Sequence, residues 1–186
     1  MPLAKLYLSA DSLLNDSFAL GHAVITSGFI PDIMLALWRG GTPVGVAVQE
    51  LFTFTGYSNQ HFPIKTSHYH GIDRRHDQVT IEGLDALSTT LKKSSRVLVV
   101  DDVFDTGITI DRVMAAIEER APHCEVRAAV TYYKPKNNQT QRTPDYFLHT
   151  TDQWIVFPHE LTGLTEKEIL KGKPELTALQ QILNKN

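Results

Sequence analysis

The sequence has 186 residues, 42% of them hydrophobic, and a chain of this kind can bury one substantial core and form a single domain over 1–186. Its formal net charge of −3 gives no overall attraction to nucleic acid or to an anionic membrane surface, and no apolar run approaches the roughly 18 residues of a membrane span. A single cysteine, Cys124, excludes an internal disulfide and suits a reducing compartment. We therefore expect a cytoplasmic protein whose partners are neither nucleic acid nor a membrane.

The hydrophobic pattern alternates between helical and strand-like segments along most of the chain. Helical spacing of apolar residues predicts a helix that begins after Ser9 or Asp11 and stops at Gly28, and further helices at 43–56, 83–93 and 109–120. Short apolar runs typical of buried strands are found at 32–38, 61–69, 96–103 and 125–133. This alternation predicts an α/β fold, in which helices flank a mostly parallel sheet. The segment 145–158 breaks the rhythm with two strand-like pieces, which predict a small hairpin-like hood within 134–186.

The stretch VLVVDDVFDTGIT, at 97–109, is the most informative part of the sequence. A buried strand leads into two adjacent carboxylates, Asp101 and Asp102, and a third acid, Asp105, begins a turn that contains glycine. In an open α/β sheet, ligands bind beyond the carboxyl ends of the strands, and these acids are expected at such an end. Their position alone therefore predicts a functional site.

The turn DTGIT, at 105–109, has the chemistry of a phosphate-binding loop. Its backbone N–H groups would open towards solvent at the start of the next helix, where the helix dipole favours an anion. Gly107 lets the backbone curl close to that anion, and the hydroxyl groups of Thr106 and Thr109 add donors. The two upstream acids would repel a phosphate, so they are expected to face sugar hydroxyls or a hydrated Mg²⁺ ion. A sugar phosphate satisfies both halves of the site.

This stretch resembles the 5-phosphoribosyl-1-pyrophosphate (PRPP) binding motif of the type I phosphoribosyltransferases. Two further segments resemble the same family in the same order. WRGG, at 38–41, is similar to its pyrophosphate-binding loop, and KPKNN with DQWIVFPHE is similar to the purine-binding hood of its 6-oxopurine branch. Three separated matches in the right order give each motif its context. The resemblance implies the type I fold, Mg²⁺ as cofactor, and PRPP with a 6-oxopurine base as substrates.

The resemblance implies that two segments of the chain, 38–41 and 101–109, bind PRPP. Asp101 and Asp102 would bind the ribose hydroxyls, and Asp102 would also contact a metal ion through water. Arg39, beside Gly40, would hold the pyrophosphate leaving group through charge-assisted hydrogen bonds, and the peptide before Arg39 is expected to be cis. The residues implied for the 5-phosphate are Asp105, Thr106, Gly107, Ile108 and Thr109.

The resemblance also implies how the base is bound. Asp105 would lie near N7 of the purine and manage its proton while N9 attacks the anomeric carbon. Lys134 would donate to O6, Trp154 would stack on the ring, and the carbonyl of Ile155 would contact the pyrimidine edge. Glu160 would contact a second metal ion through water.

Several of these residues have ordinary structural alternatives. Trp154 taken alone would more often be a core aromatic, and Lys134 a solvated lysine at the end of a strand. The histidines between 61 and 76 suggest zinc, but HYHGIDRRHD lacks a metal-ligand spacing, so we expect a mobile polar loop there. Tyr69 is the candidate functional residue of that loop, although His68 precedes it where relatives often carry serine. The side chain of Ile108 adds nothing to phosphate binding.

Two other function classes compete with a transferase. A phosphatase of the haloacid dehalogenase type also places aspartates at the end of a strand, but its paired acids are two residues apart, whereas Asp102 and Asp105 are three apart. A non-catalytic protein of the same fold that senses PRPP or a nucleotide and regulates nucleic acid would need a basic face, and the basic residues here are scattered. We therefore predict a Mg²⁺-dependent phosphoribosyltransferase that uses hypoxanthine first and guanine or xanthine next, as a homodimer or homotetramer.

Overall fold

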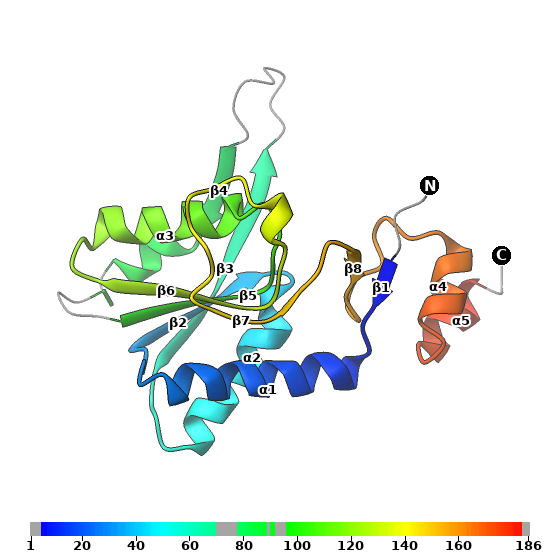
Figure 1. Ribbon diagram of the computed structural model, residues 1–186, viewed down its shortest axis with the longest axis horizontal. Coiled ribbons are helices and arrows are strands. Elements are labelled where there is room, and N and C mark those ends of the chain that lie inside the picture. The colour runs from blue at the N-terminus through cyan, green and yellow to red at the C-terminus, as the bar shows by residue number, and fades with distance from the viewer. Residues whose placement is uncertain (1–4, 70–77, 89, 92–95, 184–186) are drawn as a thin grey trace. The chain divides into compact units, whose positions relative to one another are not determined.

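The computed structural model describes residues 5–69, 78–88, 90–91 and 96–183, and the chain divides into two compact units (Figure 1). One unit is Leu14–Asp152, and the other joins Met1–Leu13 to Gln153–Asn186. Of the segment predicted to form the hood, residues 134–152 lie in the first unit and the remainder in the second. Within the described part of the chain, no helix is long and apolar enough to span a membrane.

The first unit is built on a six-stranded sheet with the strand order β4-β3-β2-β5-β6-β7. All neighbouring pairs are parallel except β3 and β4, so the predicted mostly parallel α/β sheet is confirmed. The strands are β2 (Ile33–Trp38), β3 (Gln60–Tyr69), β4 (Gln78–Glu82), β5 (Arg96–Phe104), β6 (Glu125–Tyr133) and β7 (Tyr146–Thr150).

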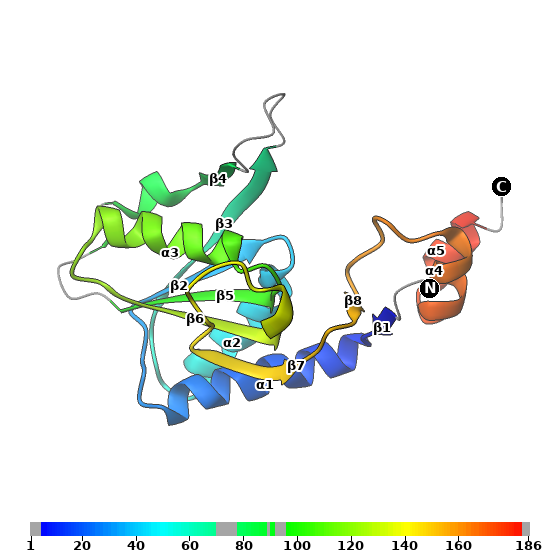
Figure 2. The same ribbon diagram turned by 45° about the horizontal axis from the view of Figure 1, so that its top comes forward.

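Helices cover both faces of this sheet, as Figures 1 and 2 show. α3 (Ile108–Arg120) lies on one face, and α1 (Ala10–Thr26) and α2 (Gly41–Phe54) lie on the other. The central strands are apolar on both faces, because each face packs against a helix layer. Val97, Leu98, Val99 and Val100 of β5 are accordingly fully buried.

The helix predicted over 83–93 is wrong. Among the described residues of that segment, only η1 (Leu84–Leu87) is helical, and it is a single 3₁₀ turn. Leu84 and Leu87 are buried, because residues three apart lie one above the other in a 3₁₀ turn and both can enter the core. The Ser88 hydroxyl donates to the carbonyl of Asp85 at 2.6 Å, a local bond of the kind that competes with helix continuation.

The hairpin-like hood predicted for 145–158 is also wrong. β7 extends the edge of the main sheet, parallel to β6, whereas β8 (Trp154–Val156) pairs in parallel with β1 (Lys5–Tyr7). The strand pattern was correct, but the two pieces pair with different partners. The partner of β8 lies near the opposite end of the chain, where local patterning gives no information on pairing.

A buried lysine ties together the second unit, in which α4 (Glu166–Gly172) and α5 (Thr177–Leu183) follow β8. Lys173 is 2% exposed, and its ammonium group donates to the carbonyl oxygens of Phe157 at 2.6 Å and Pro158 at 3.0 Å. Burial lowers the pKa of Lys173, since the charged form loses hydration there. The two carbonyl contacts compensate for that loss and fix the chain after β8 to the end of α4.

Replacing this lysine will destabilise the second unit. Lys173→Met keeps a long apolar stem but removes the donor, leaving the Phe157 and Pro158 carbonyls without it. We expect the free energy of unfolding to fall by about 1–3 kcal/mol, the usual cost of an unsatisfied buried polar group. Chemical denaturation measures this change, and Lys171→Met, at an exposed position, is the control. Equal stability of the two variants would contradict the assigned role of Lys173.

Candidate functional site

The predicted PRPP-motif residues meet where β5 leads into α3. Asp101 and Asp102 lie near the end of β5, and residues 105–107 form the turn before α3. A cavity of about 230 Å³ is lined by residues 101–107, 109 and 110. The residues between 101 and 109 that the sequence predicted to bind PRPP therefore all line this cavity, except Ile108.

The turn before α3 has the conformation expected of an anion-binding loop. Gly107 has a φ of 80°, in the left-handed region, and a Cβ there would lie 2.3 Å from the ring of Phe104. No residue with a side chain fits this position without displacing Phe104. The N–H of Ile108 lies 3.4 Å from the Thr106 hydroxyl oxygen, and α3 directs the positive end of its dipole to this turn. The backbone thus supplies donors and a favourable field for a phosphate.

The two acids before the turn share a buried site. Asp102 is 8% exposed, and its N–H donates to Oδ1 of Asp101 at 3.0 Å. Burial, together with the negative charge of Asp102, raises the pKa of Asp101 well above its ordinary value. Such a pair is relieved by a cation or by hydroxyl donors. The donor set therefore fits a Mg²⁺ ion, which proteins commonly bind through one or two carboxylates together with substrate phosphates.

The WRGG segment packs directly against these acids. It follows β2, which is the parallel neighbour of β5, and the peptide bond between Trp38 and Arg39 is cis, as the resemblance predicted. A Cβ on Gly40 would lie 2.1 Å from Oδ2 of Asp102, so only glycine allows this approach. Arg39 is exposed, and its guanidinium group forms no hydrogen bond or ion pair with any described residue, although its carbonyl accepts the N–H of Thr42 at 3.1 Å. Its guanidinium group is available to an anion.

The carboxylate of Asp105 is held from two sides. Lys134 places its ammonium nitrogen 2.9 Å from Oδ2, and Asn137 places its amide nitrogen 2.6 Å from Oδ1. Lys134 is 6% exposed, so the alternative of a solvated lysine is wrong. The sequence predicted Asp105 and Lys134 but missed Asn137, whose only signal was its place within KPKNN.

Backbone hydrogen bonds fasten the segment after β6 to the phosphate-loop turn. The N–H of Lys134 donates to the carbonyl of Phe104 at 2.9 Å, and the N–H of Gln139 donates to the carbonyl of Thr106 at 2.9 Å. The predicted base-reading lysine and the predicted phosphate loop are therefore parts of one rigid arrangement.

The remaining purine and metal candidates lie in the second unit. Trp154 begins β8 and is 52% exposed, so the core-aromatic alternative is wrong, whereas Ile155 is buried. Glu160 accepts the N–H of Phe157 at 3.4 Å. Because these residues belong to a different unit from Lys134, their joint contact with one base stays a prediction.

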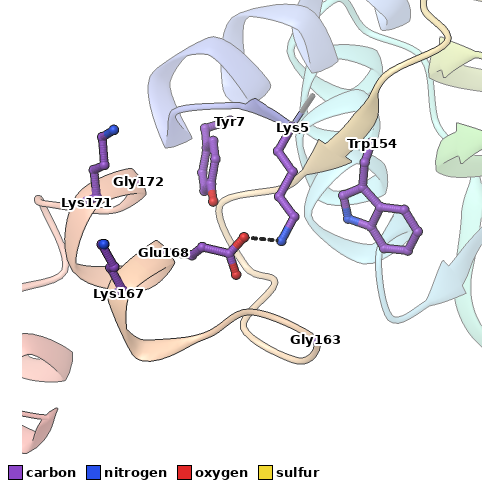
Figure 3. Close-up of a pocket in the computed structure, with 8 residues that line it drawn as sticks. All are labelled: Lys5, Tyr7, Trp154, Gly163, Lys167, Glu168, Lys171 and Gly172. Carbon is purple, nitrogen blue, oxygen red and sulfur yellow. Dashed lines mark hydrogen bonds and ion pairs between the residues drawn. The ribbon is translucent and has the colours of Figure 1, made fainter. Parts of the chain in front are cut away.

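Trp154 also lines a cavity of about 950 Å³ within the second unit (Figure 3). Lys5, Tyr7 and Trp154 come from the paired strands β1 and β8, and α4 supplies the other side. Lys5 contacts Glu168 at 2.5 Å, and this bond, supported by Thr165, lowers the pKa of Glu168 to about 2. The cavity thus combines aromatic walls with an ion pair.

The polar loop predicted at 68–77 is only partly described. Tyr69 ends β3, where its backbone is paired with Gln78, but its side chain and residues 70–77 lie outside the described residues. Its catalytic role therefore stays a prediction. In the described part of the chain, no group of three or more His, Cys, Asp or Glu residues is arranged to hold a metal ion.

A mostly parallel α/β sheet thus carries paired acids, a glycine loop and a turn with the geometry of an anion-binding loop at one edge, an arrangement that fits a sugar phosphate. The sequence profile of the phosphoribosyl transferase domain matches residues 26–164. The chain therefore belongs to the phosphoribosyltransferase family, and the predicted family and fold are confirmed.

Solved structures of this fold resemble the chain over most of its length. A purine phosphoribosyltransferase from Pyrococcus horikoshii is 27% identical with a TM-score of 0.68, and the match covers 87% of this chain and 98% of that one. A hypothetical protein from Neisseria gonorrhoeae with bound ppGpp is 20% identical with a TM-score of 0.76, over 96% and 98%. The xanthine-guanine-hypoxanthine phosphoribosyltransferase of Helicobacter pylori is 22% identical with a TM-score of 0.65, over 83% and 92%. A search of curated proteins found no match.

A methyl group at the second glycine of WRGG will disturb the end of β5. In Gly41→Ala the Cβ would lie 2.5 Å from the carbonyl oxygen of Val100 and 2.8 Å from Cα of Asp101. Both are backbone atoms, so we expect a loss of about 1–3 kcal/mol in the free energy of unfolding, as for other overpacked sites. Chemical denaturation tests this, with Val46→Ala on the exposed side of α2 as the control. A Gly41→Ala protein as stable as the control would show that the loop relaxes freely.

Proposed function

We propose that the protein is a purine salvage enzyme that transfers the 5-phosphoribosyl group of PRPP to N9 of a 6-oxopurine and releases pyrophosphate. Family membership supports a transferase and implies PRPP and a base as substrates. The observation that carries the choice of base is the buried Lys134 beside Asp105, next to the phosphate-loop turn. The purine and xanthine-guanine-hypoxanthine enzymes named above agree with this choice. Hypoxanthine is our first candidate, followed by guanine and xanthine.

The loop and the acids would bind PRPP in a defined orientation. Residues 105–109 take the 5-phosphate, and Asp101 and Asp102 take the ribose hydroxyls. As the bond to pyrophosphate breaks, positive charge develops on the ribosyl ring and negative charge on the leaving group. Arg39 stabilises that leaving group from the exposed side. Mg²⁺ held near Asp102 through water would supply further neutralisation of phosphate charge.

The Asp105–Lys134 pair would read the base and move its proton. Hypoxanthine presents O6 and N7 on the same side, and an ammonium group has three N–H donors, so Lys134 can contact both Asp105 and O6. Each carboxylate oxygen has two lone pairs, so Asp105 can still accept the N7 proton while N9 forms the new bond to the anomeric carbon. Trp154 would stack on the ring, the Ile155 carbonyl would contact its pyrimidine edge, and Glu160 would contact a second metal ion through water.

Base selectivity tests the role of Lys134. Adenine replaces O6 with an amino group, which would face the ammonium donor to donor. We expect kcat/KM for hypoxanthine to exceed that for adenine by about 10⁴, the scale at which polar sites reject an unmatched analogue. Lys134→Ala should shrink this ratio, chiefly by harming hypoxanthine, whereas Lys136→Ala should preserve it.

The measurement is pyrophosphate release from PRPP with hypoxanthine, guanine, xanthine and adenine. Comparable use of adenine by the wild-type protein, or an unchanged ratio in Lys134→Ala, would remove Lys134 from the base site. PRPP binding without turnover on any purine would instead favour a non-catalytic sensor of PRPP or a nucleotide.

Asp105 should matter for turnover more than for binding. Asp105→Asn preserves shape but removes the ionised acceptor, so kcat should fall by about 10²-fold or more, the usual scale for loss of a general base. The backbone donors of the turn remain, so PRPP should bind with nearly unchanged affinity. Single-turnover kinetics and direct titration of PRPP separate the two effects. If this variant keeps the wild-type kcat under conditions in which chemistry limits the rate, Asp105 does not take part in proton transfer.

A further inference from the structure

We propose that Asn137 is a positioning residue that holds the Asp105 carboxylate for proton transfer, an inference that rests on the proposed function. The Asn137 amide nitrogen lies 2.6 Å from Oδ1 of Asp105, while Lys134 contacts Oδ2 at 2.9 Å. With one donor on each oxygen, the carboxylate cannot turn about its terminal torsion without breaking a bond. The lone pairs that remain then point in a fixed direction.

Asn137 stands on a short, braced turn. It ends η2 (Pro135–Asn137), in which Pro135 restricts the backbone and the N–H of Asn137 donates to the Lys134 carbonyl at 3.1 Å. The side chain of Asn138 then closes the next turn, accepting the Thr140 N–H at 2.9 Å. Asn137 is exposed, but these hydrogen bonds hold the turn that carries it.

The far end of the same segment is anchored to α3 by an arginine. Arg142 donates to Asp111 at 2.8 Å and to both carboxylate oxygens of Glu118, at 3.0 and 2.6 Å. Its carbonyl oxygen accepts the side-chain amide of Asn138 at 2.8 Å. A fork of this kind fixes direction as well as distance. The segment that carries Asn137 is therefore tied to α3 at one end and to the phosphate-loop turn along its length.

The chemistry explains why Lys134 alone does not suffice. In the proposed reaction Lys134 also serves O6 of the base, so its ammonium group is shared when substrate binds. Among the described residues, Asn137 is then the donor to Asp105 that does not also bind the base. A neutral amide also suits this position, because a second cation would weaken the carboxylate as a proton acceptor.

A double-mutant cycle tests whether Asn137 acts through Asp105. Asn137→Ala should lower kcat by about 10-fold, in keeping with the cost of a misplaced catalytic group, and leave KM for PRPP nearly unchanged. In the Asp105→Asn background the same change should cost nothing further, since the group it positions has lost its function. Asn137→Gln, which keeps the amide, should recover part of the rate. Lys136→Ala, on the same turn but paired with Asp152, is the matched control.

The outcomes of these experiments either support or overturn the positioning role of Asn137. Unchanged kcat in Asn137→Ala, or an equal loss in both backgrounds, would overturn the positioning role while leaving the transferase intact. A wild-type protein inactive with every purine would instead remove the proposed function, and with it the catalytic meaning of Asn137. An activity-independent measurement tests the contact itself: the side-chain amide NMR resonance of Asn137 should shift in Asp105→Ala but not in Lys136→Ala. A resonance that stays in place would overturn the contact.

Discussion

The site depends on the parallel pairing of β5 with β2 on one side and β6 on the other. Parallel strands end at the same edge of a sheet, so the segments that follow these three strands meet there. β2 delivers the glycine loop, β5 the two acids and the phosphate-loop turn, and β6 the segment that begins at Lys134. The hydroxyl of Thr131 in β6 reinforces the arrangement, since it donates to the carbonyl of Asp102 at 2.7 Å.

This arrangement brings two carboxyl groups close together, which is electrostatically unfavourable. Asp101 and Asp102 are adjacent, largely removed from water, and packed against glycines that leave no room for a side chain. A site of this kind stores unfavourable electrostatic energy until a ligand compensates for it. The Asp105–Lys134 pair differs, because its two charges are opposite and the buried ammonium group of Lys134 donates to the carboxylate of Asp105. The acid pair and the Asp105–Lys134 ion pair therefore suit different tasks: the first favours cationic or hydroxyl partners, and the second is the proton acceptor of the reaction that we propose.

The second unit follows a different principle, because its two strands come from opposite ends of the chain. A two-stranded sheet is marginal by itself, and here it gains support from α4 and from the buried Lys173. Gly172 allows the ring of Tyr7 to lie against the helix backbone, where a Cβ would come within 2.2 Å of it. Trp154 is 52% exposed and lines the cavity of this unit together with Tyr7.

Local sequence predicted β2, β3, β5 to β8 and the three longer helices α1 to α3, because apolar periodicity directly reflects which residues face a helix layer or a neighbouring strand. It did not predict β1, β4, α4 or α5. It also showed the resemblance to the PRPP motif, because the residues of that motif are contiguous in the sequence. Tertiary structure alone decided the partners of β7 and β8, since pairing depends on contacts between distant segments. It likewise decided that 84–87 form one 3₁₀ turn, that Lys134 is buried, and that Asn137 reaches Asp105. These features depend on where separate segments of the chain meet, which no local pattern of residues encodes.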